Sequence, residues 1–197
     1  MPGPPVLSIL LASTSPQRRA ILEQLGLPFQ VVAPSYQEHD PPDAGPIELV
    51  REHALGKAHS VAAQARGRPV LGVDTAVVLD GLAYGKPRDE REASDILEQL
   101  GGRTHEVVSG LCLLGPGWEV VEHELTRVTF RPLTPRDVAA YVSTGEWHGR
   151  AGAYAIQGLG AALVEGIDGD YPNVVGLPVR LLVRILAERM PGAYGFG

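Results

Sequence analysis

Apolar runs that suit buried strands alternate with amphipathic stretches through the first half of the chain. The apolar runs cover residues 6–12, 29–33 and 69–73. Between them, apolar residues recur at helical spacing after Pro16 and over residues 46–65. This alternation of strands with helices predicts an α/β protein.

The second half of the chain is richer in expected strands. An Asp80–Gly81 turn between two short apolar runs predicts a hairpin, and a Gly-Pro-Gly turn joins two longer runs. The expected elements are strands at 76–79, 82–84, 104–114, 118–130, 153–156 and 161–164, and helices that begin after Asp89 and cover 134–143 and 177–189. Because no linker is evident, residues 1–197 are expected to form one domain with a mixed sheet and a frayed tail at 191–197.

The composition is that of a globular, mildly acidic protein. Of the 197 residues, 44% are hydrophobic and 20% charged, and the formal net charge of -6 argues against a nucleic-acid surface, which needs a positive face. No apolar run is long enough to cross a bilayer and no secretion leader is evident, so we expect a cytoplasmic protein without a membrane partner. Cys112 is the only cysteine, which excludes an internal disulfide and a thiolate zinc cluster.

The basic residues are divided unevenly between arginine and lysine. Of the 17 basic residues, only Lys57 and Lys86 are lysines. Lysine offers a compact ammonium group where arginine offers a planar fork. The two lysines are therefore candidates for a site that needs an ammonium, and chance placement is the alternative.

Residues 13–19 lie between the first expected strand and the first helix and have the layout of a phosphate site. Ser15 before Pro16 is typical of an N-cap and first helical position, so free backbone N–H groups should point toward the end of the strand. The side chains of Ser13 and Arg18 would add donors, which suits a polyphosphate. The alternative is an ordinary helix cap with exposed arginines.

Other polar residues lie where strands and loops are expected to end. Asp74 and Thr75 follow a buried strand, and Glu38 lies in a loop. Carboxylates among phosphate-binding cations are explained by a hard divalent ion such as Mg²⁺, and Asp74 is the best-placed base for an attacking water. The alternatives are an Asx-type turn at Asp74 and a solvated carboxylate at Glu38. The six histidines show no metal-ligand spacing and are interpreted as surface or structural residues.

Several segments, taken in chain order, match the motifs of one known family. They are residues 11–19 (LASTSPQRR), the Glu38 loop, Lys57, 72–75 (GVDT), 85–87 (GKP), 157–160 (QGLG) and 175–178 (VGLP). Together they resemble the Maf family of nucleoside triphosphate pyrophosphatases over nearly the whole chain. The resemblance implies an elongated mixed sheet flanked by helices, with two lobes and a central cleft, as in the inosine-triphosphatase group.

The resemblance also implies a role for each matching residue. Asp74 corresponds to the family's proton acceptor, and Glu38 and Asp74 are expected to bind a Mg²⁺ or Mn²⁺ cofactor. The positions that hold the triphosphate and the metal are matched by Ser13, Arg18, Glu38, Lys57 and Lys86. The implied reaction is attack of water at the α-phosphorus of a nucleoside triphosphate, which releases a nucleoside monophosphate and pyrophosphate.

Three positions bear on the base of the nucleotide. Thr75 and Gln157 match the branch that acts on dTTP and UTP. Gln17 departs from both known branches, because the pyrimidine branch usually has Arg there and the 7-methyl-GTP branch has Trp. The sequence of residues 13–15 (STS) is more similar to the 7-methyl-GTP branch. We therefore expect dTTP and UTP as substrates with broadened selectivity, and a 7-methyl-GTP pyrophosphatase is the alternative.

A rival hypothesis from another class is a nucleotide-binding regulator of cell division with little turnover. Such a binder needs the cationic groups but not Asp74 and Glu38, whose charges would repel a triphosphate without a metal. The two carboxylates therefore favour the enzyme. The sequence leaves the oligomeric state open, with a homodimer as one alternative.

Overall fold

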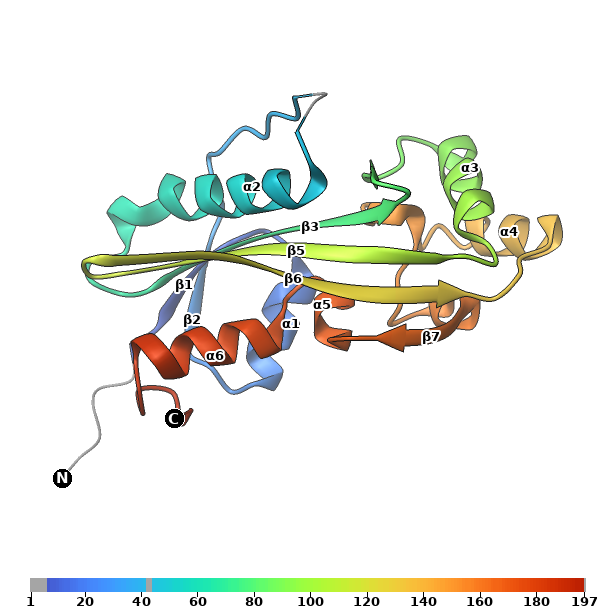
Figure 1. The fold of residues 1–197 in the computed structure, drawn as a ribbon. Coiled ribbons are helices and arrows are strands. Elements are labelled where there is room, and N and C mark those ends of the chain that lie inside the picture. Colours follow the sequence, from blue (N-terminus) through green and yellow to red (C-terminus); the bar gives the residue numbers. More distant parts are fainter. Residues whose placement is uncertain (1–6, 42–43, 197) are drawn as a thin grey trace. The chain divides into compact units, whose positions relative to one another are not determined.

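The computed structural model describes residues 7–41 and 44–196. Within them, seven strands form one mixed sheet (Figure 1). Its order is β2 (Phe29–Val32), β1 (Ile9–Ala12), β3 (Val70–Leu79), β5 (Thr104–Gly115), β6 (Trp118–Phe130) and β7 (Val164–Asp168), with β4 (Leu82–Tyr84) paired to β3. The α/β fold with a mixed sheet, expected from the sequence, is confirmed.

The chain divides into two compact units, and the division passes through β3, β5 and β6. The first unit comprises the described parts of residues 1–74, 109–124 and 176–197. The second comprises residues 75–108 and 125–175. Three strands of the sheet therefore contribute residues to both units.

The first unit is built on parallel strands whose ends coincide. Ala12 at the end of β1 pairs with Val32 at the end of β2 on one side and with Gly72 in β3 on the other. Because the ladders are parallel, the residues that follow Ala12 and Val32 leave at the same end of these two strands, whereas β3 continues past Gly72 to Leu79. The unit's helices are α1 (Pro16–Gln24), α2 (Pro46–Val61), η1 (Ala62–Gln64) and α6 (Val179–Arg189).

Helix α2 approaches β3 closely because Gly72 has no side chain. A Cβ atom at Gly72 would overlap the backbone of Ala54 on α2. Ala54 and Ala58 are themselves fully buried small residues that face the sheet. This close packing brings Lys57, one residue from Ala58, directly against the polar part of β3.

Helix α6 buries one apolar face and ties its other face to β6 by ion pairs. Arg180 contacts Glu124 at 2.8 Å and Arg184 contacts Glu122 at 2.5 Å. The buried residues of the helix are Leu181, Leu182, Ile185 and Leu186. Of the tail at 191–197, residue 197 lies outside the described residues. In the part that is described, residues 191–194 form a turn, Ala193 is buried, and the Tyr194 hydroxyl donates to the Leu7 carbonyl at 2.7 Å.

The second unit has its own apolar core. Helices α3 (Glu90–Leu100) and α4 (Pro135–Val142) begin at the caps that the sequence predicts, Asp89 and the Thr134–Asp137 capping box. Their buried faces pack with residues of β3, β5 and β6 and with Trp147 and Tyr154. The short elements of this unit are η2 (Ala151–Ala153), η3 (Leu159–Leu163) and α5 (Tyr171–Val175).

Two expectations about strands are wrong. Residues 70–79 form one continuous strand, so Asp74 lies in the middle of β3 and not at a strand end. The segments 153–156 and 161–164 are largely turns and 3-10 helix instead of strands, and β7 begins only at Val164. The physical reason at the first segment is the left-handed backbone of Gly152 (φ 69°) and Ala153 (φ 62°), which an extended strand excludes.

In the described part of the chain, no helix combines the length and the apolar character that crossing a membrane requires.

Candidate active site

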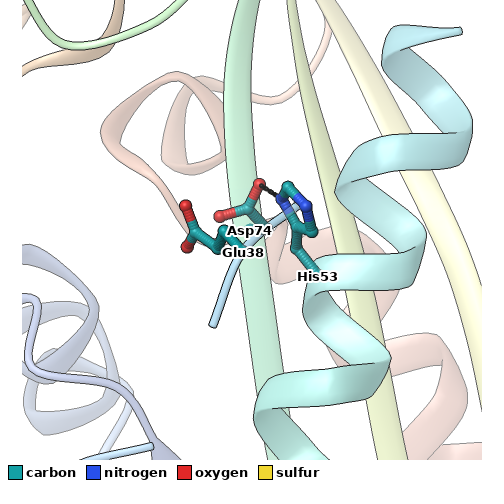
Figure 2. Close-up of side chains that lie close together, drawn as sticks. All are labelled: Glu38, His53 and Asp74. Carbon is teal, nitrogen blue, oxygen red and sulfur yellow. Dashed lines mark hydrogen bonds and ion pairs between the residues drawn. The ribbon is translucent and has the colours of Figure 1, made fainter. Parts of the chain in front are cut away.

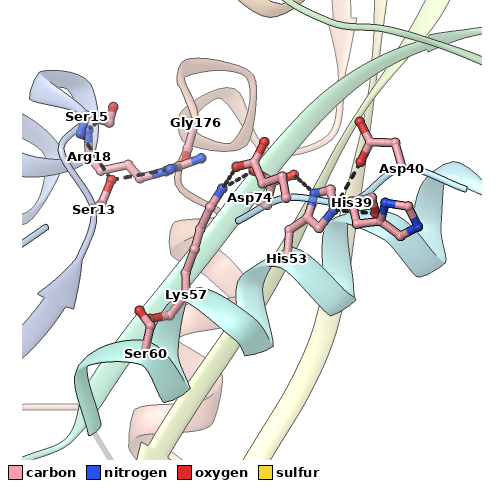
Figure 3. Close-up of polar contacts among 11 residues, drawn as sticks. Ser13, Ser15, Arg18, His39, Asp40, His53, Lys57, Ser60, Asp74 and Gly176 are labelled. Atoms are coloured by element: carbon pink, nitrogen blue, oxygen red, sulfur yellow. Dashed lines mark hydrogen bonds and ion pairs between the residues drawn. The ribbon is translucent and has the colours of Figure 1, made fainter. Parts of the chain in front are cut away.

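The loop from Ser13 to Arg18 folds into a set of donors at the end of β1. Ser15 caps α1, and its Oγ accepts from the backbone N–H of Arg18 at 3.4 Å. The buried Ser13 hydroxyl oxygen accepts from the Ser15 N–H at 3.1 Å and from Arg18 Nη1 at 3.4 Å. The helix cap predicted from the Ser15–Pro16 pair is thus present, and the side chains of Ser13 and Arg18 adjoin it (Figure 3).

Arg18 is held over this loop by the chain's C-terminal region. Its Nε donates to the carbonyl of Gly176 at 2.8 Å. Burial lowers the pKa of Arg18, and the carboxylates of Asp74 and Glu38 oppose this shift. An arginine remains cationic under these conditions, so the loop contains a guanidinium that has already lost much of its hydration. Binding an anion there costs less desolvation than at an exposed arginine.

Lys57 joins the two predicted carboxylates. Its Nζ contacts Asp74 Oδ1 at 2.5 Å (Figure 3). The same Nζ contacts Glu38 Oε1 at 2.6 Å. The Lys57 side chain is only 11% exposed and that of Asp74 only 17%, whereas that of Glu38 is 51% exposed. The structure therefore brings together Glu38 from a loop, Lys57 from α2 and Asp74 from β3.

His53 belongs to the same cluster, although the histidines were interpreted from the sequence as surface or structural residues. It is buried on α2, and its Nδ1 lies 3.4 Å from Asp74 Oδ2. Its Nε2 lies 3.1 Å from Asp40 Oδ1 and 3.4 Å from the His39 carbonyl. His53 and Lys57 are four residues apart on one helix face, and this spacing was the signal that could have found it.

Tyr36 covers the His53 ring from the loop after β2. The two ring centroids are 5.9 Å apart and the planes are tilted by 56°. Burial raises the pKa of Tyr36, and the carboxylates of Glu52, Glu38, Asp40 and Asp74 raise it further. The tyrosine therefore stays a neutral phenol and adds no charge to the site.

Glu38, His53 and Asp74 together could hold a metal ion. Each offers one ligand atom, and these atoms lie within 4.8 Å of one another (Figure 2). Two carboxylates and an imidazole fit a divalent cation by their chemistry. The ammonium of Lys57 occupies the space between Asp74 Oδ1 and Glu38 Oε1, so oxygen Oδ2 of Asp74 is the one that faces His53.

The remaining predicted residues have different surroundings. Gln17, on α1, accepts a hydrogen bond from the Ser15 hydroxyl through Oε1 at 3.2 Å. Thr75, Lys86 and Gln157 belong to the second unit, where Thr75 is partly buried in β3 and the other two are exposed. The first unit by itself thus assembles Ser13, Arg18, Glu38, Lys57 and Asp74.

The turn that carries Gln157 is fixed by one carboxylate. Glu146 accepts from the backbone N–H groups of Leu159 and Gly160, each at 2.9 Å, and from the Tyr141 hydroxyl at 2.9 Å. Burial raises the pKa of Glu146, but these hydrogen bonds outweigh burial and the net shift is downward. The anion at Glu146 therefore holds the backbone of residues 158–160 in place.

Comparisons with known proteins agree with the resemblance to the Maf family. Residues 8–189 match the Maf family, described as Maf-like protein. A dTTP/UTP pyrophosphatase of Symbiobacterium thermophilum is 47% identical over 180 residues, which cover 91% of this chain and 93% of that protein. A dTTP/UTP pyrophosphatase of Deinococcus radiodurans is 42% identical over 195 residues, which cover 99% and 100%.

Among solved structures, a HAM1 protein from Coxiella burnetii has a similar fold. It aligns with a TM-score of 0.51 and 16% sequence identity, over 92% of this chain and 99% of that one. At this identity the likeness concerns the fold alone. The family match and the two curated relatives, each of which spans more than nine-tenths of this chain, establish that the chain belongs to the Maf family.

Proposed function

We propose that this protein is a metal-dependent nucleoside triphosphate pyrophosphatase that hydrolyses dTTP and UTP to the nucleoside monophosphate and pyrophosphate. The observation that carries the proposal is the position of Asp74, a partly buried carboxylate held by Lys57 beside the donors of the Ser13–Arg18 loop. The substrate class follows from the activity named for the relatives.

Asp74 is the proposed proton acceptor for the attacking water. Lys57 holds Oδ1 at 2.5 Å, and His53 faces Oδ2 at 3.4 Å. A carboxylate held at Oδ1 by the Lys57 ammonium can accept a proton without reorienting first, which general-base catalysis favours. In the proposed reaction the resulting hydroxide attacks the α-phosphorus. The bond between the α-phosphorus and the oxygen that bridges to the β-phosphorus breaks, and pyrophosphate leaves.

The triphosphate is proposed to bind at the end of β1. The Ser13 hydroxyl and the Arg18 guanidinium supply donors there, beside the N-terminus of α1. Lys86 is proposed to add a second ammonium. These cations would stabilise the charge that develops on the departing pyrophosphate.

Glu38 and Asp74 are the proposed ligands of the divalent ion, Mg²⁺ or Mn²⁺. When bound, such an ion neutralises phosphate charge and makes coordinated water more acidic. Glu38 is suited to this role because it is half exposed and so remains accessible to an ion from solvent. Gln17, Thr75 and Gln157 are proposed to select the base. Residues 1–197 are proposed to act as one catalytic domain.

A panel of nucleoside triphosphates with pyrophosphate detection tests the proposal. We expect dTTP and UTP to be hydrolysed fastest in Mg²⁺ or Mn²⁺, and turnover to stop in EDTA. Tight nucleotide binding without pyrophosphate release would favour the regulator, and much faster hydrolysis of 7-methyl-GTP would contradict the pyrimidine assignment.

Asp74→Asn tests the proton acceptor. Turnover is expected to fall by about 10²-fold or more while nucleotide binding is retained, because the amide conserves size but cannot take the proton. Asp95→Asn, an exposed residue of α3, is the matched control and should leave turnover unchanged. Near-normal turnover in Asp74→Asn would remove Asp74 from the role.

A further inference from the structure

The imidazole of His53 faces oxygen acceptors at both ring nitrogens. Nε2 points to the Asp40 carboxylate at 3.1 Å and to the His39 carbonyl at 3.4 Å, and Nδ1 points to Asp74 Oδ2 at 3.4 Å (Figure 3). The His53 side chain is 5% exposed, so most of its surface contacts protein and not water. The ring is thus held in one orientation by oxygen atoms on two sides.

A neutral imidazole cannot donate a hydrogen bond from both of its ring nitrogens. A neutral imidazole carries one N–H and one lone pair. The N–H is best used at Nε2, where two acceptors meet. The lone pair of Nδ1 then faces the lone pairs of Asp74 Oδ2, and two acceptors that face each other are stabilised by a cation between them.

We infer that Nδ1 of His53 is the third protein ligand of the site's metal ion, beside Glu38 and Asp74, and that this nitrogen makes the site prefer Mn²⁺ over Mg²⁺. The inference rests on the metal of the proposed function but not on its substrate. Two ligand atoms bound to one such ion at ordinary bond lengths lie about 3.0–3.5 Å apart. The 3.4 Å between His53 Nδ1 and Asp74 Oδ2 falls in this range.

The neighbours of His53 are those of a metal-binding histidine. Metal-bound histidines usually donate their other N–H to a carboxylate or a backbone carbonyl, which fixes the tautomer, and Asp40 and His39 offer both. Lys57 is on the Oδ1 side of Asp74, so an ion on the Oδ2 side does not require the ammonium to leave. Imidazole nitrogen is a better ligand for transition metals than for Mg²⁺, which prefers oxygen and water.

Pulsed electron paramagnetic resonance of Mn²⁺ on the nucleotide-free protein tests the inference directly. A coordinated imidazole nitrogen modulates the Mn²⁺ spin echo at nitrogen frequencies, whereas oxygen ligands do not. We expect the modulation in the wild type, its loss in His53→Asn, and its retention in His59→Asn. His59 is an exposed histidine of the same helix that pairs with Glu119, so it controls for a general effect of removing an imidazole from α2.

Binding of Mn²⁺ and Mg²⁺ alone, measured by calorimetry, gives the second readout. His53→Asn should weaken Mn²⁺ binding by about 10-fold or more and Mg²⁺ binding by less, since the loss of a partner at a metal site typically costs 10- to 100-fold in affinity. Mn²⁺ bound without nitrogen modulation, or modulation that persists in His53→Asn, would overturn the inference while leaving the proposed metal dependence intact. Failure of the wild type to bind Mn²⁺ at all would also overturn the inference, and the proposed function would then be judged separately by turnover with Mg²⁺.

Discussion

His105 makes the stability of the second unit depend on pH. It is 1% exposed on β5, its Nε2 contacts the Tyr154 hydroxyl at 2.9 Å, and its ring packs edge-on against Phe130 and Tyr154. Burial lowers the pKa of His105 from 6.5 to about 4. A proton on this ring would therefore be a charge inside an aromatic core.

The sign and size of the effect follow from the two pKa values. Between pH 4 and 6.5 the unfolded chain binds more protons than the folded protein, so stability rises with pH. The contribution is present above pH 6.5 and is lost as the pH falls toward 4. It amounts to about 3 kcal/mol in full, of which about 2 kcal/mol is lost between pH 7 and pH 5.

Urea unfolding at pH 7 and pH 5 measures this loss. Trp118→Phe in every protein tested leaves Trp147, a core residue of the second unit, as the only tryptophan reporter. The reference is the protein with Trp118→Phe alone. From pH 7 to pH 5, its free energy of unfolding should fall by about 2 kcal/mol more than that of the His105→Gln variant, whose neutral amide can still bond Tyr154 but does not titrate. His148→Gln, which removes an exposed histidine from the same unit, should behave as the reference. Equal losses in the reference and in His105→Gln would refute the reasoning.

Further predictions concern the site and the turn of the specificity residue. Lys57→Arg should lower turnover although charge is conserved, because the wider fork cannot lie within 2.6 Å of both Asp74 and Glu38; full activity in a pyrophosphate-release assay would show that any cation suffices. Gln17→Arg should sharpen the preference for dTTP and UTP by adding a charged donor, read as the ratio of kcat/KM values across the nucleotide panel. Glu146→Gln should cost about 1–3 kcal/mol, because its amide would face a backbone N–H at Leu159 or Gly160, and unfolding followed by tryptophan fluorescence would detect it.

The features that could be predicted from the sequence are those decided by nearby residues. The caps at Ser15 and Asp89 and the Asp80–Gly81 hairpin depend on contacts within four residues, and all three are present. The prediction that a strand ends before Asp74 was wrong. It relied on the polar residues that interrupt the apolar run, but the strand continues through them. A sheet ladder depends on the backbone, which a polar side chain does not interrupt.

The partners of the site residues could be predicted only in part. The absence of a side chain at Gly72 lets α2 approach β3 until the Lys57 ammonium is buried against Asp74. The role of His53 depends on the same approach and on the path of the loop that carries Asp40. Neither the helix-to-strand distance nor the loop path is encoded in a local pattern, so the histidine looked structural.

The charge balance of the first unit explains why carboxylates and phosphate donors occur side by side. Lys57 and Arg18 supply two positive charges, and Glu38, Asp40 and Asp74 supply three negative ones within the same network. A triphosphate would therefore enter a site with a net negative charge and would be repelled by the carboxylates. A divalent ion bound to those carboxylates reverses this balance, since it turns them from repelling charges into metal ligands that also bind the phosphates through the ion. The same carboxylates that would weaken a pure nucleotide binder thus become the reason why the proposed enzyme requires its metal.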